Sequence, residues 1–339
     1  RKKMQVKCWG ARGSIAISNK NSVHAGGNTT CYEIISQCLP EGNKLFIDAG
    51  TGFVPAGWSY LPLMKNGKLI FNILFTHYHW DHILGLTLSP TTFITDIPVN
   101  MYGPVDNGVG VHDMVNHLFK KPFFPIEASR VKHHMTFKDL HNYEGHVMAV
   151  HPEGGFQTYK LDRFVYLEQK GRLPINSSSF PVDECLVIKM QKANHGNSNC
   201  ITYRFEERPT GKVFVLATDH ENYDVPPLEI RQHFANADLL IIDAQYSENK
   251  YMATAGYGHG TSQGAIKQGV IANAKRVGLT HHDPVSQDAY LEDVILSEAK
   301  DLLGNYSSTP DMLRKYSIEE VILTDQNVFL CYDYQEYEV

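Results

Sequence analysis

Residues 76–85, Thr-His-Tyr-His-Trp-Asp-His-Ile-Leu-Gly, place three histidines and one aspartate within six positions, directly after a largely apolar run. In an extended segment, residues two apart project to the same side, so His77 and His79 can bind one metal ion together. Asp81 and His82 come after the chain turns and are free to face a neighbouring ion. A histidine-rich surface loop is the alternative, but this ligand spacing behind an apolar strand favours a two-metal site.

The motif resembles the HxHxDH signature of the metallo-β-lactamase superfamily. Ile83, Leu84 and Gly85 follow it and resemble the branch that contains ribonuclease Z and related phosphodiesterases. Two glycine-containing stretches, 10–14 and 26–29, are similar to the GxRGS and GGNT patterns of hydrolases with this fold. The resemblance implies an α/β protein, a four-layer αββα sandwich, that binds a pair of divalent ions.

The 339 residues are enough to bury a large core, and we expect one hydrolase domain over residues 1–339. The formal net charge is −6, with acidic and basic residues interspersed, so no strong positive field exists to hold a long nucleic acid. We therefore expect a small phosphodiester as the binding partner.

The six cysteines form no CxxC pair, and no apolar run reaches the roughly 18 residues of a membrane helix. These features predict a cytoplasmic protein with reduced cysteines and no membrane partner. The chain starts at Arg1, so a removed N-terminal regulatory domain is a further expectation, and a homodimer is another.

Apolar runs with strand-like alternation, separated by amphipathic segments, favour α/β layers. The first run, 4–9, reads as an edge strand. Strands are expected at 4–9, 31–35, 45–47, 70–76, 98–102, 186–190, 201–205, 213–217, 239–242, 277–279, 321–323 and 328–331. Helices are expected at 111–119, 227–234, 262–274 and 289–303.

The pattern loosens from about residue 104 to 185, between the metal motifs. This is typical of an insertion, and its place in the chain favours a lid over the site. Phe123 and Phe124 lie in this segment, and paired aromatic residues are more often core than ligand contacts.

Later strands repeat the order of Phe75, Thr76 and His77, in which an apolar run is followed by a ligand. Asp219 and His281 each follow such a run after one threonine, and His195 follows another after a short turn. Sites in layered α/β folds gather beyond the carboxyl ends of strands, so these residues can converge.

Together with the resemblance, these positions assign His77, His79 and His195 to one metal, Asp81, His82 and His281 to the other, and Asp219 to both. Asp48 matches a superfamily motif whose aspartate orients the metal loop by hydrogen bonding. His282 and His220 adjoin assigned ligands, which leaves the ligand position open by one residue. His281 is preferred because it holds the strand-end place of His77. Without a thiolate ligand, zinc, manganese and iron all suit the site, and zinc is the default.

Residues 258–261, Gly-His-Gly-Thr, resemble the HxT motif of ribonuclease Z and its phosphodiesterase relatives, in which the histidine is a general acid. The alternative is a histidine that packs at a helix start. The predicted catalytic residues are thus His259 and Asp81. The predicted substrate contacts are Thr261, His282, Arg12 and Asn28.

Three functions are compatible with this pattern. The first is a dinuclear phosphodiesterase for a cyclic nucleotide or cyclic dinucleotide. The second is a ribonuclease Z-like endoribonuclease, which the absence of a basic RNA-binding arm disfavours. The third is a metal-bearing module that binds a nucleotide without hydrolysing it, which the complete ligand set disfavours.

Overall fold

Two β-sheets packed face to face form the centre of the protein. The computed structural model describes residues 3–64, 69–306 and 310–339. Within those ranges the first sheet has seven strands and the second has eight. The first sheet runs in the spatial order β17 (Glu336–Glu338), β1 (Gln5–Gly10), β2 (Cys31–Ile35), β3 (Asn43–Ile47), β4 (Ile70–Leu74), β5 (Val99–Gly103) and β6 (Met135–Asp139). The second runs β16 (Val328–Leu330), β15 (Val277–Thr280), β14 (Leu239–Asp243), β13 (Lys212–Ala217), β12 (Ile201–Glu207), β11 (Leu186–Lys192), β7 (His146–His151) and β8 (Gly155–Lys160).

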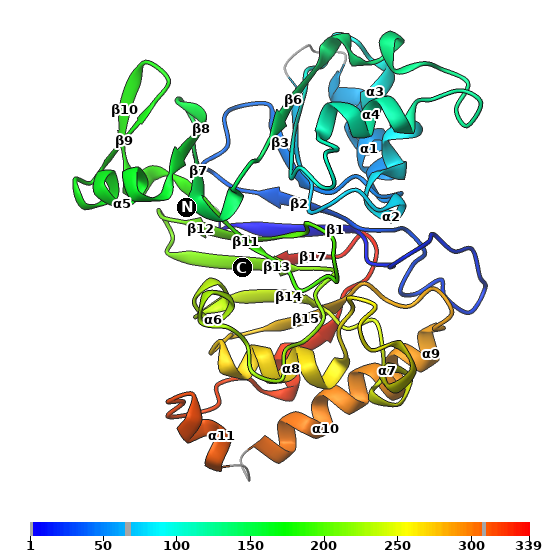
Figure 1. The fold of residues 1–339 in the computed structure, drawn as a ribbon, viewed down its shortest axis with the longest axis vertical. Coiled ribbons are helices and arrows are strands. Elements are labelled where there is room, and N and C mark those ends of the chain that lie inside the picture. The colour runs from blue at the N-terminus through cyan, green and yellow to red at the C-terminus, as the bar shows by residue number, and fades with distance from the viewer. Residues whose placement is uncertain (1–2, 65–68, 307–309) are drawn as a thin grey trace.

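Apolar cores lie between four layers, which confirms the αββα sandwich. The central core joins the inner faces of both sheets, with Ile34 and Leu45 against Ile188 and Phe214. Two further cores lie between the sheets and their helices, one on each side of the sandwich. Helices α1 (Phe53–Met64), α3 (Pro90–Phe93) and α4 (Val111–Leu118) cover the first sheet, and α6 (Leu228–Phe234), α8 (Ser262–Ile271) and α10 (Ser297–Tyr306) cover the second (Figure 1).

Parallel pairing brings the ends of several strands to one edge. Strands β3 and β4 are parallel in the first sheet, and β13, β14 and β15 are parallel in the second. The strands β14 and β15 are buried along their whole length, which accounts for their continuous apolar sequence. Residues that follow these strands therefore emerge at the same end of the sandwich.

The segment 104–185, expected as an inserted lid, contributes three strands to the two sheets. Strand β6 extends the first sheet beside β5, and β7 pairs with β11 in the second sheet. Helix α5 (Leu161–Gln169) and the hairpin of β9 (Arg172–Ile175) and β10 (Ser178–Pro181) lie beside β8 (Figure 1), and a further apolar core packs them against β7 and β11. Phe124 packs on Phe119, whereas Phe123 is 85% exposed, so the expectation of a buried pair is wrong for Phe123.

Other differences are local. β17 pairs outside β1, so β1 is not an edge strand. Residues 321–323 form no strand, and the expected helix 289–303 is divided into α9 (Asp288–Tyr290), a π-helical segment Leu291–Leu296 and α10. Among the described residues, no helix combines the length and apolarity needed to cross a membrane.

Candidate metal centre

The candidate site lies where the two sheets meet, beyond the ends of β4, β13 and β15. Two residues separate His77 from the end of β4, and one residue separates Asp219 from the end of β13. His281 is the first residue after β15. Asp219 and His281 have left-handed backbones, with φ of +51° and +61°, and so does Asp48 after β3, at +59°. This conformation turns the chain sharply at the strand end, and it is uncommon for residues other than glycine.

The first cluster contains four ligand atoms from three parts of the chain. His77 Nε2 and His79 Nδ1 lie 2.9 Å apart, and His79 Nδ1 lies 3.3 Å from His195 Nε2. Asp219 Oδ1 lies 3.7 Å from His77 Nε2 and 3.6 Å from His195 Nε2. With metal–nitrogen bonds of about 2.0–2.1 Å, the ligand atoms of a tetrahedron lie about 3.3 Å apart. The observed distances are centred on that value.

The second cluster fits the same geometry more closely. His82 Nε2 lies 3.0 Å from Asp219 Oδ2 and 3.3 Å from Asp81 Oδ2. His281 Nε2 lies 3.2 Å and 3.1 Å from the same two oxygens. Asp219 thus offers one carboxylate oxygen to each cluster, as a ligand shared by both requires.

The environment of these atoms fits a metal site. The nitrogen His82 Nε2 is fully buried and has no hydrogen-bond partner among the described residues. Histidine nitrogens and carboxylate oxygens, without a thiolate, suit a divalent transition metal. The structure brings together the seven predicted ligands, which are His77, His79, Asp81, His82, His195, Asp219 and His281.

Hydrogen bonds behind the ligands fix which ring nitrogen faces the cluster. His82 Nδ1 donates to Asp48 Oδ2 over 2.7 Å, and His195 Nδ1 donates to the Gly258 carbonyl over 2.7 Å. In both rings Nε2 is then left as the ligand atom. Asp81 is held in turn by the backbone N–H of Ser14, 2.8 Å from Oδ2.

His259 lies beside both clusters but belongs to neither four-atom set. Its ring stacks on His281 with the centroids 4.9 Å apart, and its Nδ1 donates to Asp243 Oδ2 over 2.9 Å. Asp243 is fully buried and also accepts from the backbone N–H of Gly260. The arrangement holds the imidazole in one orientation, with Nε2 as the atom left free for proton transfer.

A family model described as the beta-lactamase superfamily domain matches residues 43–282, which is most of the chain and includes every ligand of both clusters. The chain belongs to the metallo-β-lactamase superfamily. It is accordingly a metal-dependent hydrolase.

Curated relatives are similar over three quarters or more of this chain, and two solved structures are similar over all of it. Ribonuclease Z from Natronomonas pharaonis is 23% identical, with 80% of this chain and 87% of that protein covered. Ribonuclease Z from Bacillus cereus is 27% identical, with 75% and 83% covered. Unliganded yeast PDE1 has a TM-score of 0.61 at 12% identity, and the metallo-β-lactamase fold protein YhfI from Bacillus subtilis has 0.58 at 16%, each with both chains fully covered.

The histidine pKa values of the two clusters are shifted in opposite directions. Burial lowers the pKa of His77 and His79, with nearby histidine charges adding to the effect. Burial alone would also lower the pKa of His281, but Asp219 and the neighbouring carboxylates outweigh it and raise that pKa to about 9. The same balance raises the pKa of His82 well above its usual range. At neutral pH the second cluster therefore holds protons that a metal must displace.

We expect zinc binding at the second cluster to weaken more steeply with acid than binding at the first. Below pH 9 His281 is protonated, so each unit of acidification should lower the affinity there by at least roughly tenfold, whereas burial disfavours protonation of His77 and His79. Chelator-competition titrations of the metal-free protein at pH 6, 7 and 8.5 measure both affinities. Equal slopes for the two binding events would contradict this assignment.

Glu221 holds the loop that carries His259. Its buried carboxylate accepts hydrogen bonds from the backbone N–H groups of Gly256 and Gly258, at 2.7 Å and 3.1 Å, and from the Tyr251 hydroxyl at 2.5 Å. Because Gly258 also supplies the carbonyl that orients His195, the loop connects the first cluster to His259.

We expect Glu221→Ala to lower turnover by roughly 10- to 100-fold, the range for partners behind metal ligands. Glu221→Gln keeps one acceptor oxygen and should recover part of the loss. Steady-state kinetics together with metal analysis by mass spectrometry check this. A lower melting temperature at unchanged turnover would instead give Glu221 a purely structural role.

Two predicted substrate contacts, Arg12 and Asn28, form hydrogen bonds to other parts of the protein. Arg12 is 1% exposed, and its guanidinium donates to the carbonyls of Gly26, Asp283 and Ser286, so it joins loops and cannot reach a ligand. The side chain of Asn28 is engaged by Thr51 and Tyr334, neither of which contributes to a cluster. The glycine-rich stretch 10–14 does reach the site, but through the backbone of Ser14 rather than through Arg12.

The other two predicted contacts do not line the hollow beside the ligands. His282 is fully buried, and its Nε2 donates to the Cys331 carbonyl, away from the cluster. Thr261 is the N-cap of α8, where its hydroxyl accepts from Gly264 N, and it lines a different hollow from the ligands. His220 is buried against Gln268. His281 is thus the member of its doublet that faces the clusters.

Sequence reasoning missed Asp243, Ser14 and Glu221. Asp243 ends β14 after an apolar run, which is the same signal that indicated Asp219, so it could have been found. Ser14 acts through its backbone, and Glu221 acts on a distant loop. Neither of these two roles has a sequence signal.

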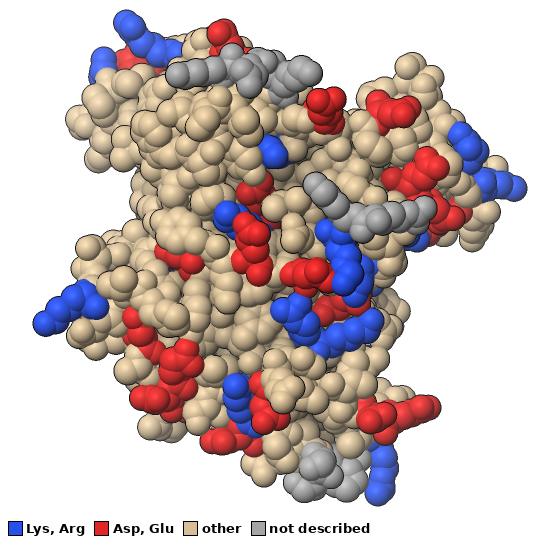
Figure 2. Space-filling view, turned by 180° about the vertical axis from the view of Figure 1, so that it is seen from behind, with Lys and Arg blue, Asp and Glu red and all other residues tan. Residues whose placement is uncertain are grey.

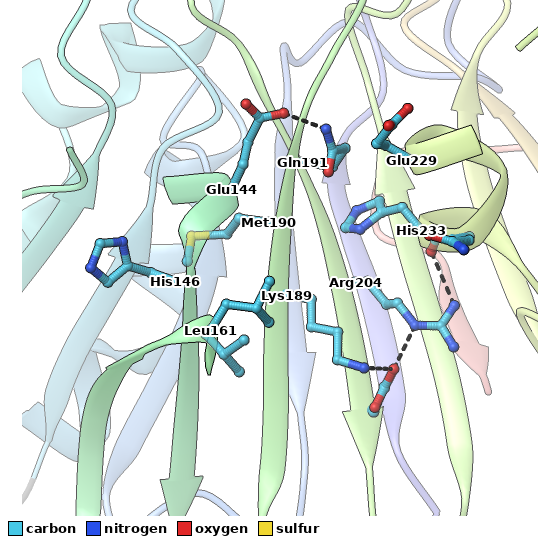
Figure 3. A pocket seen from close by; sticks show the side chains of 12 residues that line it. Glu144, His146, Leu161, Lys189, Met190, Gln191, Arg204, Glu229 and His233 are labelled. Carbon is cyan, nitrogen blue, oxygen red and sulfur yellow. Dashed lines mark hydrogen bonds and ion pairs between the residues drawn. The ribbon is translucent and has the colours of Figure 1, made fainter. Parts of the chain in front are cut away.

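The ligands open onto a small hollow of about 250 Å³, lined by Asp81, Asp219, His259, His281 and three further residues. A larger hollow of about 520 Å³ lies over β7, β11 and β12 and shares no lining residue with it (Figure 3). There Glu206 pairs with Lys189 and Arg204, at 2.9 Å and 2.6 Å. The small hollow is the one that the metal ligands line.

Proposed function

We propose that the protein is a dinuclear metal phosphodiesterase that hydrolyses a small phosphodiester, a cyclic nucleotide or cyclic dinucleotide. The observation that carries this proposal is the shared position of Asp219 between two four-atom clusters, with His259 stacked on His281 next to them. Hydrolases with this arrangement need two ions and one proton donor, and the chain has a candidate for each. Zinc is the expected metal, with manganese and iron as alternatives.

When bound, a pair of divalent ions would lower the pKa of a water and neutralise the phosphate oxygens. The chain supplies the remaining chemistry. Asp243 accepts the Nδ1 proton of His259 and fixes the ring, so that Nε2 can give a proton to the departing alkoxide. Asp48 and the Gly258 carbonyl hold their histidine ligands in one tautomer, which keeps the hollow in a fixed shape.

Size and charge support a small substrate. The hollow over the ligands has a volume of about 250 Å³, near the lower end for ligand sites. On the face shown in Figure 2, the largest group of Lys and Arg side chains is interleaved with Asp and Glu. Such a surface gives weak, strongly salt-dependent attraction for a long polyanion.

Product analysis tests the proposal. Protein loaded with zinc or manganese is incubated with a panel of cyclic mono- and dinucleotides and with bis(p-nitrophenyl) phosphate, and products are identified by mass spectrometry. Ring opening of at least one cyclic nucleotide is expected. Cleavage of lactones or thioesters without any phosphodiester cleavage would contradict it, and a tight nucleotide complex without product would instead support a binding module.

The names of the relatives favour a second candidate, a ribonuclease Z-like endoribonuclease. It predicts cleavage of a structured transfer RNA precursor, with turnover that falls steeply as salt rises. Parallel assays of a transfer RNA precursor and cyclic nucleotides at 50 and 200 mM salt separate the two candidates.

A further inference from the structure

An apolar hollow lies directly beside the metal-ligand hollow. It has a volume of about 460 Å³ and is lined chiefly by Trp80, Leu84, Leu118, Phe123 and Phe124. Trp80 lines both hollows, because it stands in the chain between the ligands His79 and Asp81. A molecule held at the ligands can therefore extend along the Trp80 ring into the apolar hollow.

Two of the lining aromatic rings are exposed to solvent. Trp80 is 61% exposed and Phe123 is 85% exposed. Exposed aromatic rings that line one hollow beside a catalytic centre are typical of ligand sites, since covering them removes apolar surface from water. Lys120 and His117 add polar groups to the same lining, which can fix the orientation of a ligand.

We infer that this apolar hollow, defined by Trp80 and Phe123, binds the nucleobase of the substrate. The inference rests on the proposed function and names the part of the substrate that the metal ligands cannot hold. The hollow of about 250 Å³ at the ligands suits a phosphate and sugar but is small for a whole nucleotide. The neighbouring 460 Å³ supplies the missing room, with flat aromatic surfaces that suit the face of a base.

Intrinsic fluorescence provides a test that does not depend on turnover. The chain has three tryptophans, of which Trp9 is buried and Trp58 and Trp80 are exposed. In a Trp58→Phe background Trp80 is the exposed reporter. Adenosine monophosphate should quench it, and adding Phe123→Ala should weaken adenosine monophosphate binding by roughly tenfold, as expected for loss of one stacking ring. Ribose 5-phosphate, which lacks the base, should bind equally to both proteins.

The control is Tyr166→Ala, which removes an exposed aromatic ring on α5 outside this hollow. It should leave adenosine monophosphate binding unchanged. Equal affinity for adenosine monophosphate with and without Phe123 would overturn the inference. If Phe123→Ala also abolished self-association, the hollow would be a contact between copies of the chain. If cyclic nucleotides are hydrolysed with unchanged KM in Phe123→Ala, the base site fails while the proposed function stands. If nucleotide binding depends on Phe123 but no nucleotide is hydrolysed, the base site stands while the proposed function fails.

Discussion

Asp219→Asn is expected to weaken metal binding at both clusters at once and to lower turnover by more than roughly 100-fold, beyond the effect of changing a partner behind a ligand. Asp219 Oδ1 lies in the first cluster and Oδ2 in the second, so an amide removes a negative charge from both. Asparagine adopts the left-handed backbone of this position readily, so the fold should be retained. Metal content by mass spectrometry and steady-state turnover measure the two effects.

The matched control is Asp224→Asn, an exposed carboxylate five residues further along the same loop that lines neither the clusters nor their hollow. It should keep full metal content and turnover. If Asp219→Asn retains one ion at full affinity, Asp219 serves a single cluster and the shared-ligand assignment is wrong.

His259→Ala is expected to lower turnover of a cyclic nucleotide by roughly 10²- to 10⁴-fold, the range for general acid catalysis, and to leave metal content unchanged. His259 belongs to neither four-atom cluster, so its removal takes away a proton donor and not a ligand. The loss should be much smaller for bis(p-nitrophenyl) phosphate, because p-nitrophenolate leaves without a proton. The alkaline limb of the pH–rate profile, which a required acid imposes, should disappear in the variant.

His133→Ala, which removes an exposed histidine away from the site, is the control for general effects of losing an imidazole. Equal losses for both leaving groups, together with reduced metal content, would show that His259 supports the clusters and does not donate the proton. Asp243→Asn should give a milder version of the His259→Ala result, since the ring loses its charged acceptor but keeps its nitrogen atoms.

The metal ligands could be predicted because each follows an apolar strand, and the carboxyl ends of parallel strands meet at one edge. The sequence favours His281 over His282 because His281 lies at the strand end. The backbone conformation at His281 explains why this preference agrees with the structure. With φ of +61° at His281, the chain turns so that this side chain faces the clusters and the next one packs inward against Cys331.

The rest could not be predicted because it depends on pairings between distant segments. Two of the three carbonyls that accept from Arg12, those of Asp283 and Ser286, lie 271 and 274 residues away in the sequence, so nothing near Arg12 indicates these contacts. The sheet positions of β6 and β7 likewise depend on long-range pairing with β5 and β11, which short strands with weak alternation do not reveal. The sequence of this region is therefore typical of an insertion, although the region contributes β6, β7 and β8 to the two sheets.

The left-handed backbones at Asp48, Asp219 and His281 lower the stability of the fold but place side chains that the metal site needs. Each costs about 1–3 kcal/mol relative to an unstrained residue, and glycine would relieve it. A population of variants selected for heat resistance alone should therefore accumulate glycine at these three positions and lose its metal-binding capacity. Only continued selection for chemistry would keep the charged side chains at such bends.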